Sequence, residues 1–140
     1  MRSTARDGQL DPRCLGRGIT LCVDKTQKVT RYVKDGKTLK IVASNFGPDK
    51  GNPKFGLWSF TREGVFRIFH KGHNEVSSLY GYQMPYYMAF SGGEGFHYSD
   101  YFRTNGYKDV TQGCVTLNDR AASKWLYQHT PMKTKVVVHH

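Results

Sequence analysis

The chain has 140 residues, which is the usual size of one domain and too short for two domains with separate cores. Hydrophobic residues make up 38% and aromatic residues 14%, which excludes a disordered chain, while 15 glycines and 5 prolines favour turns and short strands over long helices. The net charge of +10 favours polyanionic surroundings, which include nucleic acid, anionic lipid and acidic cell-wall polymers, and does not choose among them. No apolar stretch of about 18 residues occurs, so no membrane-spanning helix is predicted.

The first third of the chain predicts an antiparallel meander. The β-rich runs 19–23 and 29–33 are separated by a polar connection and are typical of a hairpin. Asp35-Gly36 is a preferred two-residue turn, and 38–43 resumes with β-forming residues.

The rest of the chain predicts further strands and one helix. A loop over 46–53 precedes a strand over 64–69, and two strands, 86–90 and 96–98, flank a turn at Gly92-Gly93. Asn118 or Asp119 can cap a helix over 121–127, the only helix that the pattern predicts, and 135–138 is a closing strand. The expected class is mainly β with one short helix after Cys114.

One cysteine and one histidine form the best candidate catalytic pair. Gly113 and Cys114 lie in a turn before a strand, where backbone amides can point at a bound oxyanion. A thiol becomes a strong nucleophile as the thiolate, and a nearby imidazole can accept its proton. His97, on or beside a predicted strand end, is the best-placed base. The alternative is a buried apolar cysteine and a structural histidine.

The wider pattern resembles the L,D-transpeptidase catalytic domain of bacterial peptidoglycan enzymes. That pattern is an upstream His, then Ser or Thr, His, Gly, Cys, an aliphatic residue, and often Asn or Arg. Here it reads His97, Thr111, Gln112, Gly113, Cys114, Val115 and Thr116. Residues 61–66 also look like the family's Thr-Pro-x-Gly-x-Phe segment, and 84–93 resemble the strand that leads to the catalytic histidine.

The resemblance covers about 19–138 and implies a fold and a chemistry. The fold would be a β-sandwich of the L,D-transpeptidase type, preceded by an N-terminal extension or added segment, 1–18. The reaction would cleave the bond after the third residue of a peptidoglycan stem peptide through a thioester. Cys114 would be the nucleophile and His97, oriented by a backbone carbonyl, the base and later the acid. The amides around Gly113 and Cys114 would form the oxyanion hole, and no cofactor is needed.

Two residues depart from the pattern. Gln112 stands where a second histidine is usual, and Thr116 where Asn or Arg is common. We interpret both as changes to substrate contacts or to pKa values, although an inactive descendant of the family is an alternative. The candidate groove residues are Tyr86, Tyr87, Tyr98, Ser99, Thr111, Gln112 and Thr116. Ordinary core packing is an equal alternative for each tyrosine.

The remaining cysteines predict a disulfide, and the histidines predict no metal site. Cys14 and Cys22 are close enough in sequence to pair if the protein is exported, the alternative being two reduced, buried thiols. His70, His73, His97, His129 and Cys114 could converge, but none of the usual zinc-ligand spacings is present.

The expected partners follow from the resemblance and the charge. Peptidoglycan stem peptides would be the substrate, a carbapenem a covalent inhibitor, and anionic wall polymers a retaining surface. We expect an extracellular or wall-associated monomer whose signal peptide is absent from this sequence. The alternative of another class is a basic nucleic-acid-binding module, for which Arg31-Tyr32 and 101–103 interleave charge with aromatic rings.

Overall fold

The computed structural model describes residues 10–47, 61–77, 81–92, 94–109, 111 and 113–140. Its strands are β1 (Ile19–Asp24), β2 (Val29–Lys34), β3 (Lys37–Asn45), β4 (Gly64–Arg67), β5 (His70–Val76), β6 (Gln83–Ser91), β7 (Glu94–Tyr98), β8 (Val115–Leu117) and β9 (Lys135–His139). Its helices are α2 (Asp100–Asn105) and α3 (Arg120–His129), with single 3-10 turns η1 (Pro12–Cys14) and η2 (Gly106–Lys108).

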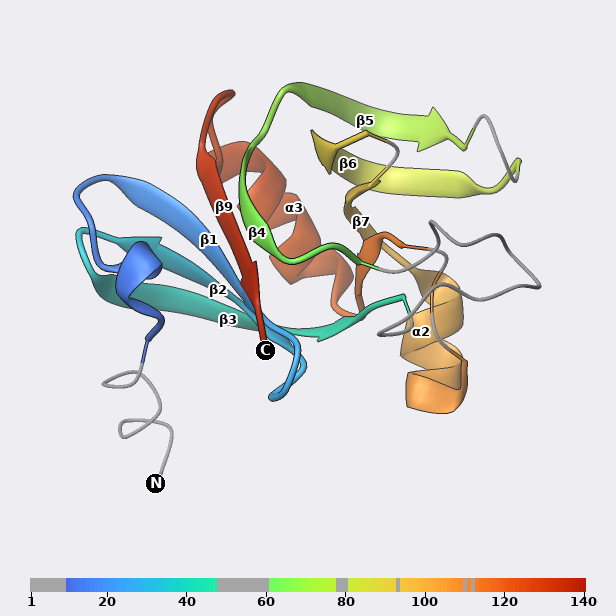
Figure 1. The fold of residues 1–140 in the computed structure, drawn as a ribbon. Helices are drawn as coiled ribbons and strands as arrows, with labels where there is room; N and C mark the ends of the chain where they lie inside the picture. Colours follow the sequence, from blue (N-terminus) through green and yellow to red (C-terminus); the bar gives the residue numbers. More distant parts are fainter. Residues whose placement is uncertain (1–9, 48–60, 78–80, 93, 110, 112) are drawn as a thin grey trace.

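The strands form one curled sheet whose halves share strand β3. The order is β4-β9-β1-β2-β3-β8-β7-β6-β5. Residues 37–43 of β3 pair with β2, whereas Ser44 and Asn45, at its C-terminal end, pair with β8. Because two ends of one strand have different partners, the sheet turns there and its halves come to face each other (Figure 1). The expected mainly β, sandwich-like class is confirmed.

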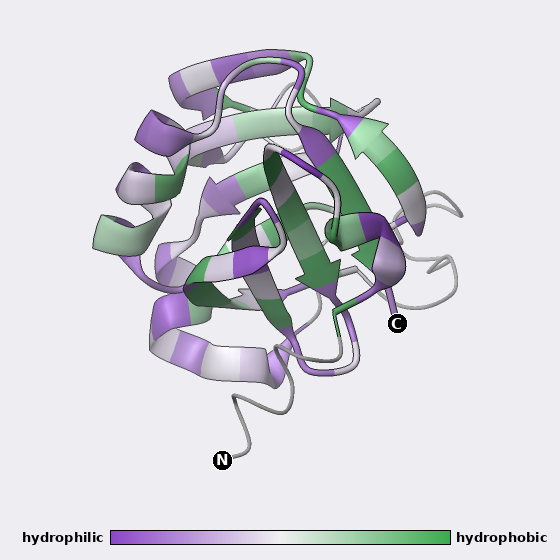
Figure 2. Ribbon diagram, turned by 90° about the vertical axis from the view of Figure 1, so that its left-hand side faces the viewer, coloured by the Kyte–Doolittle hydropathy of each residue, from purple (hydrophilic) through white to green (hydrophobic). Residues whose placement is uncertain are grey.

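The main core lies between the halves of the sheet, with helix α3 against β6 and β7. It includes Leu21 and Val136 from one half, Met88 and Phe96 from the other, and Leu126 from α3. Figure 2 shows the hydrophobic residues concentrated in the strands. Burying a side chain of this size stabilises the fold by about 1.5–3 kcal/mol, so α3 and both halves depend on one another.

The predicted hairpins at the start of the chain are confirmed. Strands β1 and β2 pair antiparallel, and β2 pairs with β3 across Asp35-Gly36. These two residues have φ angles of 51° and 82°, the left-handed values that a type I′ turn needs and that Asp-Gly adopts readily. The hairpin of β6 and β7 is confirmed too, although Gly93 lies outside the described residues.

Two elements were not predicted from sequence. Helix α2 begins after Ser99, whose hydroxyl accepts the Phe102 amide at 3.1 Å, and Phe102 is its only buried residue. A helix with one buried residue carries no apolar periodicity, so the prediction of a single helix was wrong. Strand β5 is a mostly polar edge strand, which likewise lacks the alternation of a buried one. Most of the predicted loop over 46–53 lies outside the described residues.

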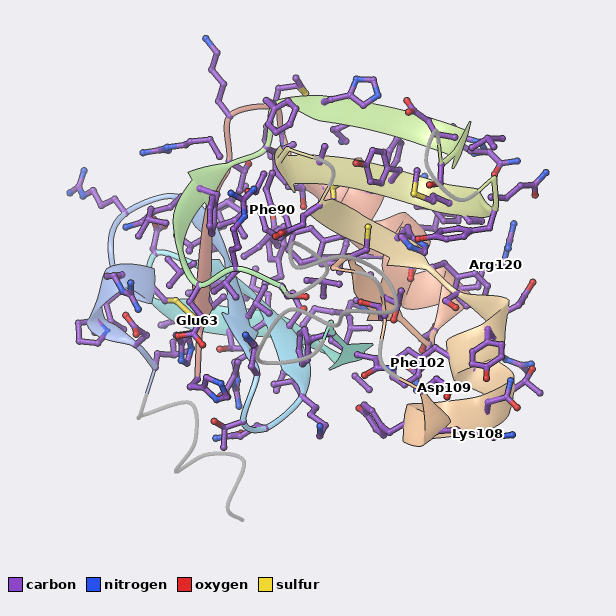
Figure 3. The ribbon with its side chains drawn as sticks, turned by 45° about the vertical axis from the view of Figure 1, so that its right-hand side comes forward. Glu63, Phe90, Phe102, Lys108, Asp109 and Arg120 are labelled. Carbon is purple, nitrogen blue, oxygen red and sulfur yellow. A yellow bond between two sulfur atoms is a disulfide. The ribbon has the colours of Figure 1, made fainter. Side chains whose placement is uncertain are left out.

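The predicted disulfide joins Cys14 and Cys22, whose Cα atoms lie 6.0 Å apart. Both residues are fully buried, in a small cluster with Leu10, Val33 and Val137. The bond is drawn in yellow in Figure 3. It fastens the segment before β1 onto the sheet, beside the short turn η1.

Replacing both cysteines with alanine should lower the free energy of unfolding. A crosslink closing a loop of this size stabilises by about 2–3 kcal/mol, mainly by restricting the unfolded chain. Urea unfolding of the wild type and of the C14A/C22A variant measures the difference. Reductant should destabilise the wild type and leave the variant unchanged; equal stability of the two proteins would contradict the prediction.

Candidate active site

Strands β7 and β8 bring the predicted pair together. They are parallel, with Phe96 opposite Val115 and His97 opposite Thr116. Side chains alternate along a strand, so Phe96 and Val115 point into the core, where both are 0% exposed. Cys114 lies two residues before Thr116 and therefore shares its face with His97.

An apolar cluster encloses the thiol. Met84, Tyr87 and Ala89 of β6 pack around Cys114, and Tyr82 packs against them. The Tyr82 ring also lies 6.0 Å from the imidazole of His97, centroid to centroid. The thiol and the imidazole thus belong to the same environment on this face of the sheet.

The resting sulfur is a neutral thiol. Cys114 is 6% exposed. Burial raises its pKa to about 11, a hydrogen bond from the Gly95 backbone opposes the shift, and the negative charge of Glu94 adds to it. At neutral pH the sulfur therefore keeps its proton until a base accepts it.

His97 is held as a neutral base. Its Nδ1 lies 2.8 Å from the carbonyl oxygen of Tyr98, and since a carbonyl only accepts, Nδ1 carries the proton. Nε2 is then unprotonated, and among the described residues it has no hydrogen-bond partner. Burial also lowers the pKa of His97. The orienting carbonyl expected from sequence is that of Tyr98.

The turn before Cys114 is closed by two threonine hydroxyls. Thr111 Oγ1 donates to the Cys114 carbonyl at 2.6 Å and accepts the Gly113 amide at 3.1 Å. Thr61 Oγ1 donates to the Gly113 carbonyl at 2.7 Å. Thr111 thus supports the turn. The Gly113 amide is engaged, so its part in an oxyanion hole stays a prediction that requires Thr111 to release it.

The predicted groove residues divide between two faces. Tyr87 and Thr116 share the face of Cys114, and the buried hydroxyl of Thr116 has no partner within the described part of the chain. Tyr86 and Tyr98 instead flank Arg120 of α3, whose guanidinium lies 5.7 and 5.4 Å from their ring centroids. Figure 3 shows Arg120 on the side of the molecule that carries α2. Their contact with a peptide stays a prediction that this placement does not favour.

The positions of the other two predicted groove residues, Ser99 and Gln112, give no evidence about the groove. Ser99 is the cap of α2, and Gln112 lies outside the described residues.

Sequence reasoning missed four residues around Cys114, which are Arg62, Tyr82, Glu94 and Gly95. Strand alternation could have found Gly95, because it lies two residues from His97 and therefore on the same face. It could also have excluded Tyr98, which is next to His97 and points to the opposite face.

Neither metal-site geometry nor a membrane span is found in the described ranges. No three His, Cys, Asp or Glu side chains there gather closely enough to hold a metal ion. The histidines are dispersed: His70 pairs with Glu75, and His129 stacks on Trp125. No helix of those ranges has the length and apolarity to cross a membrane.

The fold and the site define a mainly β domain with a neutral histidine on one strand and a buried cysteine directly before the parallel strand beside it. The family model of the L,D-transpeptidase catalytic domain matches residues 18–138. The chain therefore belongs to the L,D-transpeptidase catalytic-domain family. No curated protein matches it.

Solved structures of this family have the same fold. An L,D-transpeptidase from Stackebrandtia nassauensis is 26% identical with a TM-score of 0.76, over 97% of this chain and 63% of that one. One from Xylanimonas cellulosilytica is 22% identical with a TM-score of 0.73, over 98% and 68%. L,D-transpeptidase 3 from Mycobacterium tuberculosis, in complex with a faropenem-derived adduct, is 16% identical with a TM-score of 0.67, over 89% and 61%.

Replacing Gly95 with alanine should disturb the site. An added Cβ would lie 2.5 Å from the Met88 carbonyl oxygen and 2.6 Å from Cε1 of Tyr87. Overpacking against backbone costs about 1–3 kcal/mol, which thermal unfolding would detect. Gly16→Ala is the matched control, because nothing lies within 4 Å of its added Cβ. Equal melting of both variants and the wild type would contradict the close approach at Gly95.

Alkylation of Cys114 should depend on pH as expected for a buried thiol. With a pKa of about 11, the rate should keep rising above pH ~9, where an ordinary thiol of pKa about 8.5 is levelling off. Iodoacetamide labelling followed by intact mass measures this, since Cys14 and Cys22 are bonded. A plateau near the ordinary pKa would show that the thiol is not buried in this way.

Proposed function

We propose that this chain is a cysteine acyltransferase acting on peptidoglycan stem peptides. Family membership supports the class of reaction. The observation that supports the assignment of residues is the pairing of β7 with β8, in which His97 lies opposite Thr116, two residues from Cys114. In this proposal the enzyme cleaves the bond after the third stem residue and passes the acyl group to an amine or to water.

The first half-reaction forms a thioester. His97 Nε2 accepts the thiol proton while Cys114 Sγ attacks the substrate carbonyl carbon, and the carbonyl electron pair moves to oxygen. The backbone amide of Cys114, and that of Gly113 once Thr111 releases it, would stabilise this oxyanion. The C–N bond then breaks, and the departing amine takes the proton from His97.

The second half-reaction returns the enzyme to its resting form. The acceptor amine or water gives a proton to His97 as it attacks the thioester carbonyl. Collapse of the tetrahedral intermediate expels the Cys114 sulfur, which regains the proton. An amine acceptor gives a cross-link or an exchanged D-amino acid, and water gives L,D-carboxypeptidase activity.

The neutral resting state of Cys114 and His97 suits this order of reaction steps. Burial disfavours thiolate and imidazolium separately, as the pKa directions of Cys114 and His97 show. Proton transfer is therefore coupled to attack, when the thiolate charge passes to the substrate oxygen. The Thr116 hydroxyl, opposite His97, is available for a substrate contact in place of the family's Asn or Arg.

Inhibition and location follow from the same proposal. Another L,D-transpeptidase has been solved in complex with the carbapenem imipenem, and we expect a carbapenem to acylate Cys114. The net charge of +10 would retain an extracellular monomer within anionic wall polymers. Release from isolated walls should then increase with salt.

The decisive experiment incubates the protein with a tetrapeptide-bearing muropeptide and a D-amino acid. We expect loss of the terminal residue, an exchanged product, and at least a hundredfold loss of rate in His97→Gln, the usual scale of general base catalysis. Cys114→Ala should show neither turnover nor a carbapenem adduct. A folded wild type with a free Cys114 thiol but no product and no adduct would overturn the proposal and favour a degenerate wall-binding or nucleic-acid-binding domain.

A further inference from the structure

An ion pair lies beside the thiol that the proposed chemistry does not use. Glu94 begins β7, and its side chain is 8% exposed. The Arg62 guanidinium donates from Nε to one Glu94 oxygen at 3.2 Å, and the Arg62 backbone amide donates to the other at 3.3 Å. The Arg62 side chain also donates to Ser91. Two donors of one residue thus hold the carboxylate, and Ser91 holds the guanidinium.

The chain neighbours of both partners form hydrogen bonds with the turn of Cys114. Thr61, next to Arg62, donates its hydroxyl to the carbonyl of Gly113. Gly95, next to Glu94, makes a backbone hydrogen bond to Cys114. Each member of the pair is therefore one residue from a contact with residues 113–114.

The electrostatic consequence has a definite sign. A negative charge near a buried thiol disfavours its thiolate, and a positive charge paired with that carboxylate reduces the effect. The charge of Glu94 raises the pKa of both Cys114 and Tyr87. Burial raises the pKa of Glu94 itself, and Arg62 opposes that shift.

We propose that Arg62 and Glu94 form a charge-tuning pair for Cys114, in which Glu94 restrains formation of the thiolate and Arg62 holds Glu94 and offsets its charge. Both are positioning residues, because they act on the substrate only through the sulfur. The inference rests on the proposed function for its role in acyl transfer. The titration of Cys114 can be measured without any substrate.

Other charged and titratable groups surround the same site. Lys25 donates to the Thr61 carbonyl at 2.9 Å, and its charge, like that of Arg62, opposes the rise that burial causes in the pKa of Glu94. The groups that face Cys114 or its neighbour Tyr87 from β5, β6, β7 and the connection before β6 are His70, Glu75, Tyr82, Tyr87 and His97. These groups are unchanged in every variant, so differences between the variants in the pKa of Cys114 report on Arg62 and Glu94.

The test is the pH profile of Cys114 alkylation in Glu94→Gln, Arg62→Gln and the double variant. Glu94→Gln should lower the apparent pKa of Cys114 by about one unit, and Arg62→Gln should raise it by a similar amount. One unit means about tenfold more thiolate, and the accompanying loss of nucleophilicity takes back roughly threefold. Alkylation below the pKa should therefore be about threefold faster in Glu94→Gln and about threefold slower in Arg62→Gln.

The controls separate charge from damage to the fold. Arg62→Lys keeps the charge and should stay near the wild-type profile. Arg13→Gln removes the arginine of another ion pair, with Asp11, and should change nothing at Cys114. In the double variant the two opposite shifts should add, because both charges act on the same sulfur, and its profile should lie between those of the single variants.

Shifts in the same direction for both single variants, or none in Glu94→Gln, would overturn the inference. So would a double variant whose profile lies outside the range set by the two single variants. Melting curves identify a variant that fails to fold. If Arg62→Gln is that variant, the pKa of Cys114 in Glu94→Gln and Arg62→Lys still tests the inference. Opposite shifts in a protein without peptide turnover would uphold the tuning pair and reject the proposed function.

Discussion

The register between β7 and β8 is the constraint on which the site depends. Sliding β8 by one residue would turn Val115 out of the core and point Cys114 into it, because side chains alternate along a strand. Burial of Phe96 and Val115 opposes that slip, and each contributes about 1.5–3 kcal/mol. β3 fixes β8 from its other side, where Ser44 pairs with Leu117. The packing of the core thus determines which face carries the thiol.

Burial also determines the chemical state of that face. A protein interior disfavours an isolated charge, and both Cys114 and His97 respond by staying neutral. Their reaction creates opposite charges side by side, which attract strongly in a medium of low dielectric constant. A site of this kind resists stray oxidation and alkylation at rest, since the thiolate and not the thiol is reactive. Its reactivity depends on a substrate that can accept the developing charge.

Local signals predicted most of the fold and gave the candidate pair Cys114 and His97, whose catalytic roles stay predictions. The β-branched runs of β1, β2 and β9 and the Asp35-Gly36 turn were readable because their causes lie within a few residues. Helix α2 was not, since its single buried residue leaves no periodicity. Tyr86 and Tyr87 were both placed in the groove, although neighbours on a strand cannot share a face without a bulge. The pairing of Arg62 with Glu94 could not be predicted, because 32 residues separate them and only the tertiary fold brings them together.

The same pair explains a departure from the family pattern in chemical terms. Arg62 stands where the related Thr-Pro-x-Gly-x-Phe segment has proline. A proline there has no backbone N–H, so it would remove the amide that Arg62 donates to Glu94 along with the guanidinium. A carboxylate that is 8% exposed and lacks both donors would be costly to keep ionised. The arginine therefore keeps the buried glutamate ionised, and the proposed effect of the pair on Cys114 requires that charge.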